Sequence, residues 1–382
     1  GMSQYGAKAK ALEGRSASQI IEYYYSGAQV APMDSLGLKS FLADDPDPLW
    51  IGLAQSVPSV DLLPWGLPME VCDGDGCVPL EQGSPMRVVA VDEGCEVGPV
   101  AGWPEGAVVM DCALDVDLNG SPSGVEVPGV CVAGSCDYGR GILHLRPAND
   151  GLHVVLELDI DEYLYGLAEV PSSWPAAALG AQVITARSYA LRKANSYGPE
   201  SGFSTWRQDL CWCHLVDDTR DQAYRGLQWE SAAWREAVDS ATGKVVAYGG
   251  SIISTFYSSS TGGATEDVED VWGGSPDQYP YLRSVPDPWS VSAAADNPYA
   301  SWTRTLTAAS VARTLGWDRV TGATLLEAAP GARLRLSGED GGAPVTRDLS
   351  GERARTLFGL RSGGLERVRF VAASPGGASA GS

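Results

Sequence analysis

Residues 167–175 read Leu-Ala-Glu-Val-Pro-Ser-Ser-Trp-Pro, and residues 176–191 continue as Ala-Ala-Ala-Leu-Gly-Ala-Gln-Val-Ile-Thr-Ala-Arg-Ser-Tyr-Ala-Leu. Proline suits the first turn of a helix, and apolar residues recur at positions 179, 183, 186 and 190. This spacing predicts a helix over about 175–196 with that stripe buried. Glu169 therefore lies on a proline-bounded turn before a helix, where a side chain can project into a cleft from a rigid backbone, as a general acid requires.

The rest of the chain predicts an α+β fold, β-rich and mixed, with a few packed helices. Residues 3–27 are typical of a helix pair, and residues 36–150 of short strands separated by Gly, Asp and Pro. Other expected elements are a hairpin over 141–147 and 152–158, a helix over about 228–241, a hairpin over 243–248 and 251–257, and one helix over about 307–315 with strands around it up to 370.

Composition limits the possible functions. The chain has 382 residues, 44% of them hydrophobic, which suffices for one large or two ordinary domains. No apolar run approaches the roughly 18 residues of a membrane-spanning helix. The net charge of −21 argues against nucleic acid and against an anionic lipid surface. A neutral glycan or one without stem peptides fits this charge better than a teichoic acid.

Eight cysteines indicate the compartment. Six of them fall within residues 72–136, and an even number so closely spaced is typical of a disulfide-stapled, extracellular segment. Reduced buried thiols are the alternative. The expected local pairs are Cys72 with Cys77, Cys95 with Cys112, and Cys131 with Cys136.

Several separate motifs point to one family. They are Gly-Met-Ser-Gln-Tyr-Gly-Ala at 1–7, the stretch 169–191, Asp-Thr-Arg-Asp-Gln-Ala-Tyr-Arg-Gly at 218–226, Phe-Tyr-Ser-Ser-Ser-Thr-Gly-Gly at 256–263, and Trp272 followed by Pro-Tyr-Leu at 280–282. Together they resemble the SpoIID/LytB family, named for a sporulation protein, over about 1–28 and 140–290. The family includes lytic transglycosylases that cut peptidoglycan glycan strands and proteins named as enhancers of wall amidases.

Two departures from the family pattern concern the opening motif. The family commonly reads Gly-His-Gly-x-Gly-Met-Ser-Gln-Tyr-Gly, and this chain begins partway through it. The chain is therefore expected to be a fragment of a longer precursor, so the lack of a visible signal peptide says little. The motif usually follows the catalytic segment, whereas here it comes first, which predicts a circularly permuted order.

The expected organisation has five parts. They are the opening motif and helices of the core (1–45), a cysteine-containing β insertion or subdomain (46–140), the SpoIID-like catalytic core (141–300), a C-terminal α/β part of the core (301–372) and a disordered tail (373–382).

The resemblance implies that Glu169 is catalytic. In a lytic transglycosylase one carboxyl protonates the leaving oxygen and then takes the proton of the sugar's own 6-hydroxyl, so a second carboxylate is not needed. An apolar shelf from Val170, Pro171 and Trp174 would keep the acid protonated. The alternative is a solvated surface glutamate. Participation of a second carboxylate, such as Asp217 or Asp218, is a further alternative.

The resemblance also implies contacts with the sugar. The predicted substrate-binding residues are Ser3, Gln4, Tyr5, Trp174, Gln182, Arg187, Tyr257, Ser258, Ser259, Ser260, Gly262 and Gly263. Two of them, Gln182 and Arg187, share the helix with the buried stripe, and their alternative role is to brace the Glu169 loop.

Cys211, Cys213 and His214 form a weak candidate for structural zinc, which prefers such ligands. Some relatives hold zinc near this point with a cysteine where this chain has Asp221. The favoured alternative is a disulfide from either cysteine to a distant one, because pairing across a single residue is expected to be strained. No other metal or cofactor is expected.

Two functions are therefore predicted as alternatives. The first is a secreted or wall-associated lytic transglycosylase that cleaves MurNAc–GlcNAc strands to a 1,6-anhydro product. The second is a wall-glycan-binding enhancer of a cell-wall amidase without turnover of its own. Only three histidines are present, and none lies in a nucleophile motif that would indicate a triad.

Overall fold

The computed structural model describes residues 1–45, 47–65, 69–73, 76–81, 83–92, 94–98, 106–110, 114–118, 129–132, 135–328, 331–361 and 367–371, with residues 100, 112 and 365. Two compact units make up the chain. Ala28–Thr255 is the Glu169 unit, and Gly1–Gly27 with Phe256–Ser382 is the motif unit. Mixed sheets and several helices confirm the α+β class.

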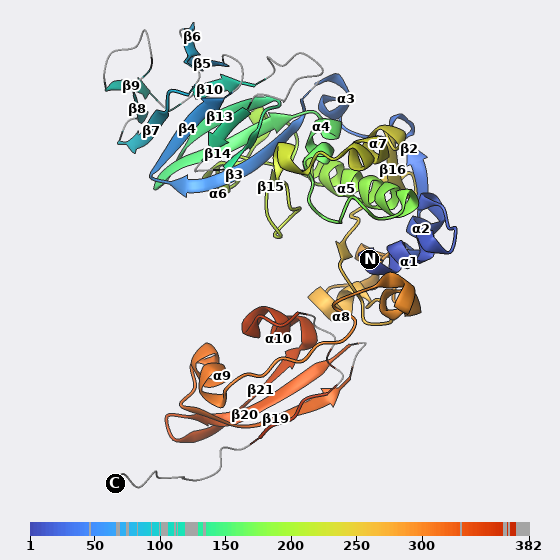
Figure 1. Ribbon diagram of the computed structural model, residues 1–382. Coiled ribbons are helices and arrows are strands. Elements are labelled where there is room, and N and C mark those ends of the chain that lie inside the picture. Colours follow the sequence, from blue (N-terminus) through green and yellow to red (C-terminus); the bar gives the residue numbers. More distant parts are fainter. Residues whose placement is uncertain are drawn as a thin grey trace, which may run out of the picture. The chain divides into compact units, whose positions relative to one another are not determined.

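A seven-stranded sheet lies at the centre of the Glu169 unit (Figure 1). The predicted hairpin is confirmed, since its two strands pair from Ile142 with Glu157 to Ala148 with Gly151. In spatial order the strands are β15 (Leu215–Val216), β3 (Leu49–Val57), β14 (Gly151–Leu158), β13 (Ile142–Ala148), β10 (Leu114–Asp117), β5 (Met69–Asp73) and β6 (Gly76–Leu80).

The cysteine-containing segment of the Glu169 unit also forms a six-stranded sheet. Its strands in spatial order are β12 (Ser135–Tyr138), β11 (Gly129–Val132), β4 (Ser59–Trp65), β7 (Met86–Val91), β8 (Gly94–Gly98) and β9 (Ala107–Met110). Two predicted disulfides are confirmed: Cys72–Cys77 joins the neighbouring strands β5 and β6, and Cys95–Cys112 joins β8 to Cys112. The predicted pair Cys131–Cys136 falls outside the described side chains.

Three helices of the Glu169 unit lie side by side next to the seven-stranded sheet (Figure 1): α4 (Ile160–Tyr165), α5 (Ala176–Tyr197) and α7 (Ala232–Ser240). The stripe predicted for α5 is buried. The helix expected from 228 begins later, because Gly226–Trp229 is a 3-10 turn and Ser231 caps α7. The remaining elements of the unit are α3 (Phe41–Asp44), α6 (Thr205–Leu210) and a small sheet of β17 (Ser251–Ile252), β16 (Lys244–Tyr248) and β2 (Gln29–Pro32).

The motif unit begins with the predicted helix pair, α1 (Gln4–Leu12) and α2 (Ala17–Tyr24). Ser16 caps α2 through a capping box with Gln19. The opening strand β1 (Met2–Ser3) pairs in parallel with β18 (Tyr257–Ser258). The short helix α8 (Val268–Trp272) follows the glycine pair.

The C-terminal part of the motif unit is an antiparallel sheet of β19 (Arg319–Glu327), β20 (Arg333–Asp340) and β21 (Ala343–Ser350), accompanied by α9 (Ala308–Leu315) and α10 (Gly351–Phe358) (Figure 1). The prediction of a single helix in this part is wrong. Ser350 caps α10, whose buried residues are Gly351 and Ala354. Neither has a large apolar side chain, so the sequence carries little hydrophobic signal for this helix. The predicted disordered tail lies outside the described residues.

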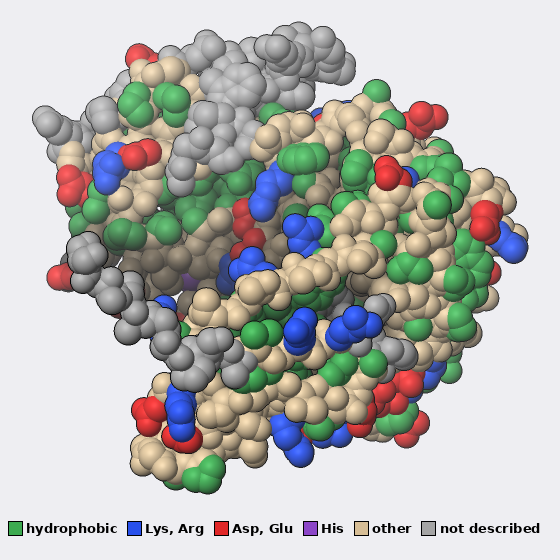
Figure 2. Space-filling model, turned by 60° about the horizontal axis from the view of Figure 1, so that its bottom comes forward, with side chains coloured by type: hydrophobic (Ala, Val, Ile, Leu, Met, Phe, Trp, Pro, Cys, Tyr) green, Lys and Arg blue, Asp and Glu red, His purple; other side chains and the backbone are tan. Residues whose placement is uncertain are grey.

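The surface in Figure 2 carries acidic and basic side chains interspersed with hydrophobic ones. The net negative charge of the sequence is therefore not gathered into one acidic field on that face. Within the described part of the chain, no helix combines the length and apolar character needed to cross a membrane.

Candidate functional site

Glu169 lies on the turn between α4 and α5, where it is half-buried. Its Oε1 accepts the backbone N–H of Ala223 at 2.7 Å, and the N–H of Ala168 donates to the carbonyl of Ala223 at 2.8 Å. An isolated bridge between Leu167 and Tyr224 continues this pairing. The motif at 218–226 is thus the backbone partner of the Glu169 turn, and it fixes the carboxyl group at one oxygen.

Two stacked tyrosines support this pairing. The rings of Tyr163 and Tyr224 have centroids 5.4 Å apart, and the Tyr163 hydroxyl donates to Gln222 Oε1 at 3.0 Å. A Cβ at Gly166 would lie 2.5 Å from the Tyr224 ring, so this position requires glycine. Burial raises the pKa of Tyr163 well above its usual value, with Asp221 and Glu169 adding to the rise, so the hydroxyl stays neutral.

Asp221 ties α5 to the same segment. Its Oδ1 accepts the Tyr189 hydroxyl at 2.8 Å and pairs with the ammonium of Lys193, while Oδ2 accepts the N–H of Val216 at 2.9 Å. Asp221, whose side chain is 4% exposed, is therefore a structural carboxylate in this chain. The motif at 218–226 signalled the segment, but nothing in the sequence indicated these partners from α5.

Of the two alternative carboxylates, Asp217 and Asp218, Asp217 is the less exposed to solvent. Burial raises its pKa to about 6, against the opposing charge of Arg225. Its backbone carbonyl accepts the N–H of Tyr224 at 3.1 Å, so it lies on the segment that pairs with the Glu169 turn. Asp218, by contrast, has a side chain that is 40% exposed and pairs with Arg220. Asp217 can therefore exchange a proton near neutral pH.

Three predicted substrate contacts in the Glu169 unit are buried. Arg187 is 0% exposed and donates to Asp161, to the Ala241 carbonyl at 2.6 Å and to the Lys244 carbonyl. Gln182 is 1% exposed and Trp174 9%. Arg187 and Gln182 therefore offer no surface to a sugar in this structure, and their contact with sugar stays a prediction. Elements on several sides of α5 bury residues beyond its apolar stripe. The partners of Arg187 lie at the start of α4 and after α7, so Arg187 ties α5 to these two segments.

In the motif unit the structure brings the opening motif and the bend at 257–263 together. The β1–β18 ladder joins them, and the N–H of Tyr5 donates to the Ser259 carbonyl at 3.0 Å. Ser3 and Gln4 are buried, and Ser3 caps α1 by accepting the Gly6 N–H. Neither residue offers a surface to a sugar in this structure, and their contact with sugar stays a prediction. The predicted contacts that reach the surface are Tyr5, Tyr257, Ser258, Ser259, Ser260, Gly262 and Gly263.

The bend is also held by a residue that the sequence did not reveal. Asn297 donates from Nδ2 to the Ser260 hydroxyl at 2.8 Å and to the Ser290 carbonyl at 2.7 Å. It lies 37 positions from Ser260 in a segment without a recognisable motif. No local pattern could have predicted this contact.

Cys211 and Cys213 form a disulfide with each other, so the prediction of a distant partner is wrong. Trp212 adopts a left-handed φ of 48°, and the two Cα atoms lie 5.2 Å apart, within the usual range for a disulfide. His214 Nδ1 accepts the Trp50 N–H, and Nε2 donates to the Gly198 carbonyl. With both sulfurs bonded and both ring nitrogens engaged, these residues do not fit a zinc site. Among the described residues no other His, Cys, Asp and Glu group is arranged for a metal ion.

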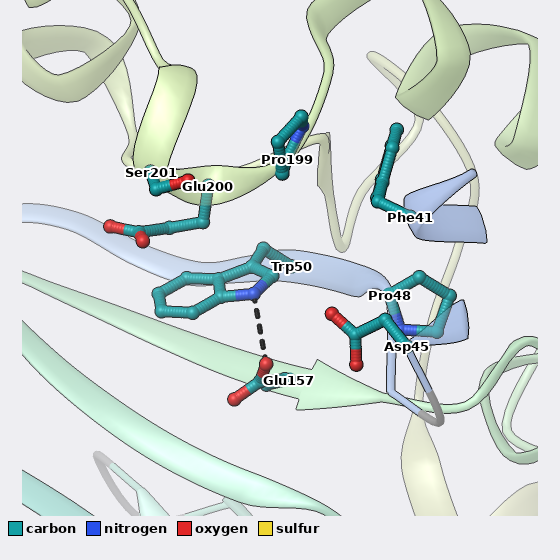
Figure 3. A pocket seen from close by; sticks show the side chains of 8 residues that line it. All are labelled: Phe41, Asp45, Pro48, Trp50, Glu157, Pro199, Glu200 and Ser201. Atoms are coloured by element: carbon teal, nitrogen blue, oxygen red, sulfur yellow. Dashed lines mark hydrogen bonds between the residues drawn. The ribbon is translucent and has the colours of Figure 1, made fainter. Parts of the chain in front are cut away.

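A separate cavity of about 150 Å³ lies in the Glu169 unit, beside the Trp50 indole (Figure 3). Its lining combines aromatic and proline side chains with three carboxylates, and it includes neither Glu169 nor any predicted sugar contact: Phe41, Asp45, Pro48, Trp50, Glu157, Pro199, Glu200 and Ser201. The Trp50 indole N–H donates to Glu157 at 3.2 Å, and its ring stacks on His144. The cavity is thus built independently of the Glu169 turn.

Comparison with known proteins shows which family the central segment of the chain resembles. Residues 148–248 match the SpoIID family model, described as "Stage II sporulation protein". The segment contains the Glu169 turn, α5 and the motif at 218–226, and it confirms the predicted resemblance to the SpoIID/LytB family over these residues. The opening motif lies outside the matched segment, so its permuted order stays a prediction.

Individual relatives agree with the family match. An amidase enhancer of Bacillus subtilis is 36% identical over 138 residues, which are 36% of this chain and 16% of that protein. An uncharacterised protein of Brachyspira hyodysenteriae is 32% identical over 147 residues, 38% of this chain and 36% of that protein. Stage II sporulation protein D of Bacillus subtilis is 28% identical over 246 residues, 59% of this chain and 64% of that protein. The chain thus matches less than two thirds of each relative.

Proposed function

We propose that the protein is a peptidoglycan lytic transglycosylase with Glu169 as its general acid and base. The SpoIID domain and the likeness to an amidase enhancer support a function in cell-wall processing. The observation that supports catalysis is the Glu169 turn itself. A half-buried carboxyl is held at 2.7 Å by a backbone N–H from a second family motif, so its orientation is fixed before substrate arrives.

The proposed reaction needs one carboxyl group. Glu169 in its acid form donates a proton to the glycosidic oxygen as the C1–O bond breaks. The resulting carboxylate then accepts the proton of the 6-hydroxyl of the same sugar, whose oxygen bonds to C1 and closes the 1,6-anhydro ring. Atoms and charge balance without water, and Glu169 returns to its acid form.

The alternative function is enhancement of a cell-wall amidase by binding wall glycan. The 36% identity to an amidase enhancer favours it. In that case the turn around Glu169 would serve binding, and amidase stimulation would survive loss of the acid. Secretion or attachment to the wall is part of both proposals and agrees with the disulfides Cys72–Cys77 and Cys95–Cys112.

Glu169→Gln separates the two functions. Glutamine keeps an oxygen that can accept the Ala223 N–H but cannot act as the acid, so release of anhydro sugars from purified glycan strands should fall by about 100-fold or more. The matched control is Glu236→Gln, which removes an exposed carboxyl from α7 of the same unit and should leave the rate unchanged. Enhancement would be supported instead if the unaltered protein released no anhydro product, while both the unaltered protein and Glu169→Gln stimulated an amidase.

A further inference from the structure

We infer that Asp287 is a positioning residue for glycan binding, which holds the opening motif and the bend at 257–263 in one arrangement. The nature of the ligand rests on the proposed function, whereas the positioning role rests on contacts within the motif unit. Asp287 is 0% exposed and lies between Pro286 and Pro288. It therefore cannot touch a glycan and acts through the residues that it binds.

Every polar group of Asp287 is used to hold a neighbour. Oδ1 accepts the Tyr24 hydroxyl at 2.7 Å, and Oδ2 accepts the Thr261 hydroxyl at 2.6 Å. The backbone N–H donates to the Gly263 carbonyl at 2.7 Å, and the backbone carbonyl accepts the Ser290 hydroxyl at 2.9 Å. Hydrogen bonds to a carboxylate are stronger than those between neutral groups. One side chain thus joins α2 to the bend.

Tyr24 and Asp287 together explain why the opening motif has glycine at position 6. A Cβ at Gly6 would lie 2.1 Å from the Tyr24 hydroxyl and 2.5 Å from Asp287 Oδ1. No side chain can occupy this space while Tyr24 and Asp287 are bonded. The close approach places the first turn of α1 against the pair, so the opening motif is shaped by Asp287 although the two are far apart in sequence.

Asp287 also supports the exposed part of the bend, from the buried side of the backbone. Ser258, Ser259 and Gly262 reach the surface, while Thr261 and Gly263 on either side of Gly262 bind Asp287. The hydroxyl of Thr261 also lies 3.1 Å from that of Ser290. Loss of the carboxylate would remove the acceptor of the fully buried Tyr24 hydroxyl and would leave the half-buried Thr261 hydroxyl with the Ser290 hydroxyl alone. The bend would then sample several conformations, and glycan binding would have to select one of them.

The variant Asp287→Asn tests this role because it preserves size and removes one acceptor. The matched control is Asp277→Asn, which alters an exposed aspartate that also follows a proline. We expect Asp287→Asn to raise the Kd for purified, peptide-free glycan strands at least tenfold. Amide hydrogen exchange of residues 2–6 and 257–263 should become at least tenfold faster. The control should change neither value.

A second variant keeps the test valid if Asp287→Asn does not fold. Tyr24→Phe removes one donor to the carboxylate from a fully buried side chain, so an effect on binding must pass through the packed interior. We expect the Kd to rise about threefold or more, with faster exchange in the bend. Wild-type affinity and exchange in both variants would overturn the inference. Failure of the proposed function appears separately, as absence of anhydro products from unaltered protein that still binds glycan.

Discussion

The turn around Glu169 places one carboxylate among buried polar side chains, whereas the bend at 257–263 places several exposed hydroxyls on a backbone held from behind. Around the turn, partners such as Tyr163, Gln222 and Asp221 are buried and specific. In the bend, Ser258 and Ser259 meet solvent. Under the proposed function, the turn would carry the chemistry and the bend would bind the glycan. Chemistry at a single atom needs a rigid surrounding, whereas binding can be spread over several weak contacts.

The largest effect on stability is expected in the Glu169 unit, from Arg187→Met. Removing this buried guanidinium leaves Asp161 and two backbone carbonyls without their donor, which should lower the free energy of unfolding by about 3–5 kcal/mol. Urea denaturation measures the change. The control Arg220→Met breaks an exposed pair with Asp218 and should cost less than about 1 kcal/mol. Similar losses in both variants would contradict the contrast between buried and exposed contacts.

His214 should make the same unit sensitive to acid. Burial lowers its pKa to about 4 from an ordinary 6.5, so the unfolded chain binds more protons between these values. Its contribution is therefore present above pH 6.5 and is lost as the pH falls, by about 3 kcal/mol at pH 4. His214→Asn should remove this slope from unfolding free energies measured between pH 4 and 7. An unchanged slope would show that His214 is not the group that titrates.

Asp217 should act with the opposite sign in an overlapping pH range. Burial raises its pKa to about 6 from an ordinary 3.8, so the folded chain holds the extra proton and stability falls as the pH rises through this range. Because the side chain keeps some contact with solvent, the effect should be about 1–2 kcal/mol. Asp217→Asn should be more stable than the unaltered protein at pH 7 and equal to it only below the ordinary pKa of 3.8. A variant that is less stable at pH 7 would refute this assignment.

The smallest effects are expected in the bend. Ser259 contributes its backbone carbonyl to the Tyr5 N–H, while its side chain is exposed. Ser259→Ala should therefore change the free energy of unfolding by less than about 0.5 kcal/mol. It should weaken glycan binding about two- to fivefold, the scale of one neutral hydrogen bond. Calorimetry with glycan strands measures the affinity, and a loss of 100-fold would place the bend alongside Glu169 in importance.

Local patterns predicted much of the fold and the position of Glu169. The hairpin at 142–158, the buried stripe of α5 and the turn before it depend on residues close in sequence, so periodicity and proline placement suffice. The contacts of Asp221 with Tyr189 and of Asp287 with Tyr24 join distant segments, and no local signal encodes them. The Cys211–Cys213 disulfide depends on the left-handed φ of Trp212, an uncommon conformation that its residue type does not predict.

Digestion of purified glycan strands in water enriched in oxygen-18 tests the central claim most directly. If Glu169 transfers the proton within the sugar, the new ends are 1,6-anhydro rings, and mass spectrometry should find no heavy oxygen in them. Hydrolysis by water activated at a second carboxylate would instead leave each new reducing end heavier by one oxygen-18 atom. That result would contradict the single-carboxylate mechanism.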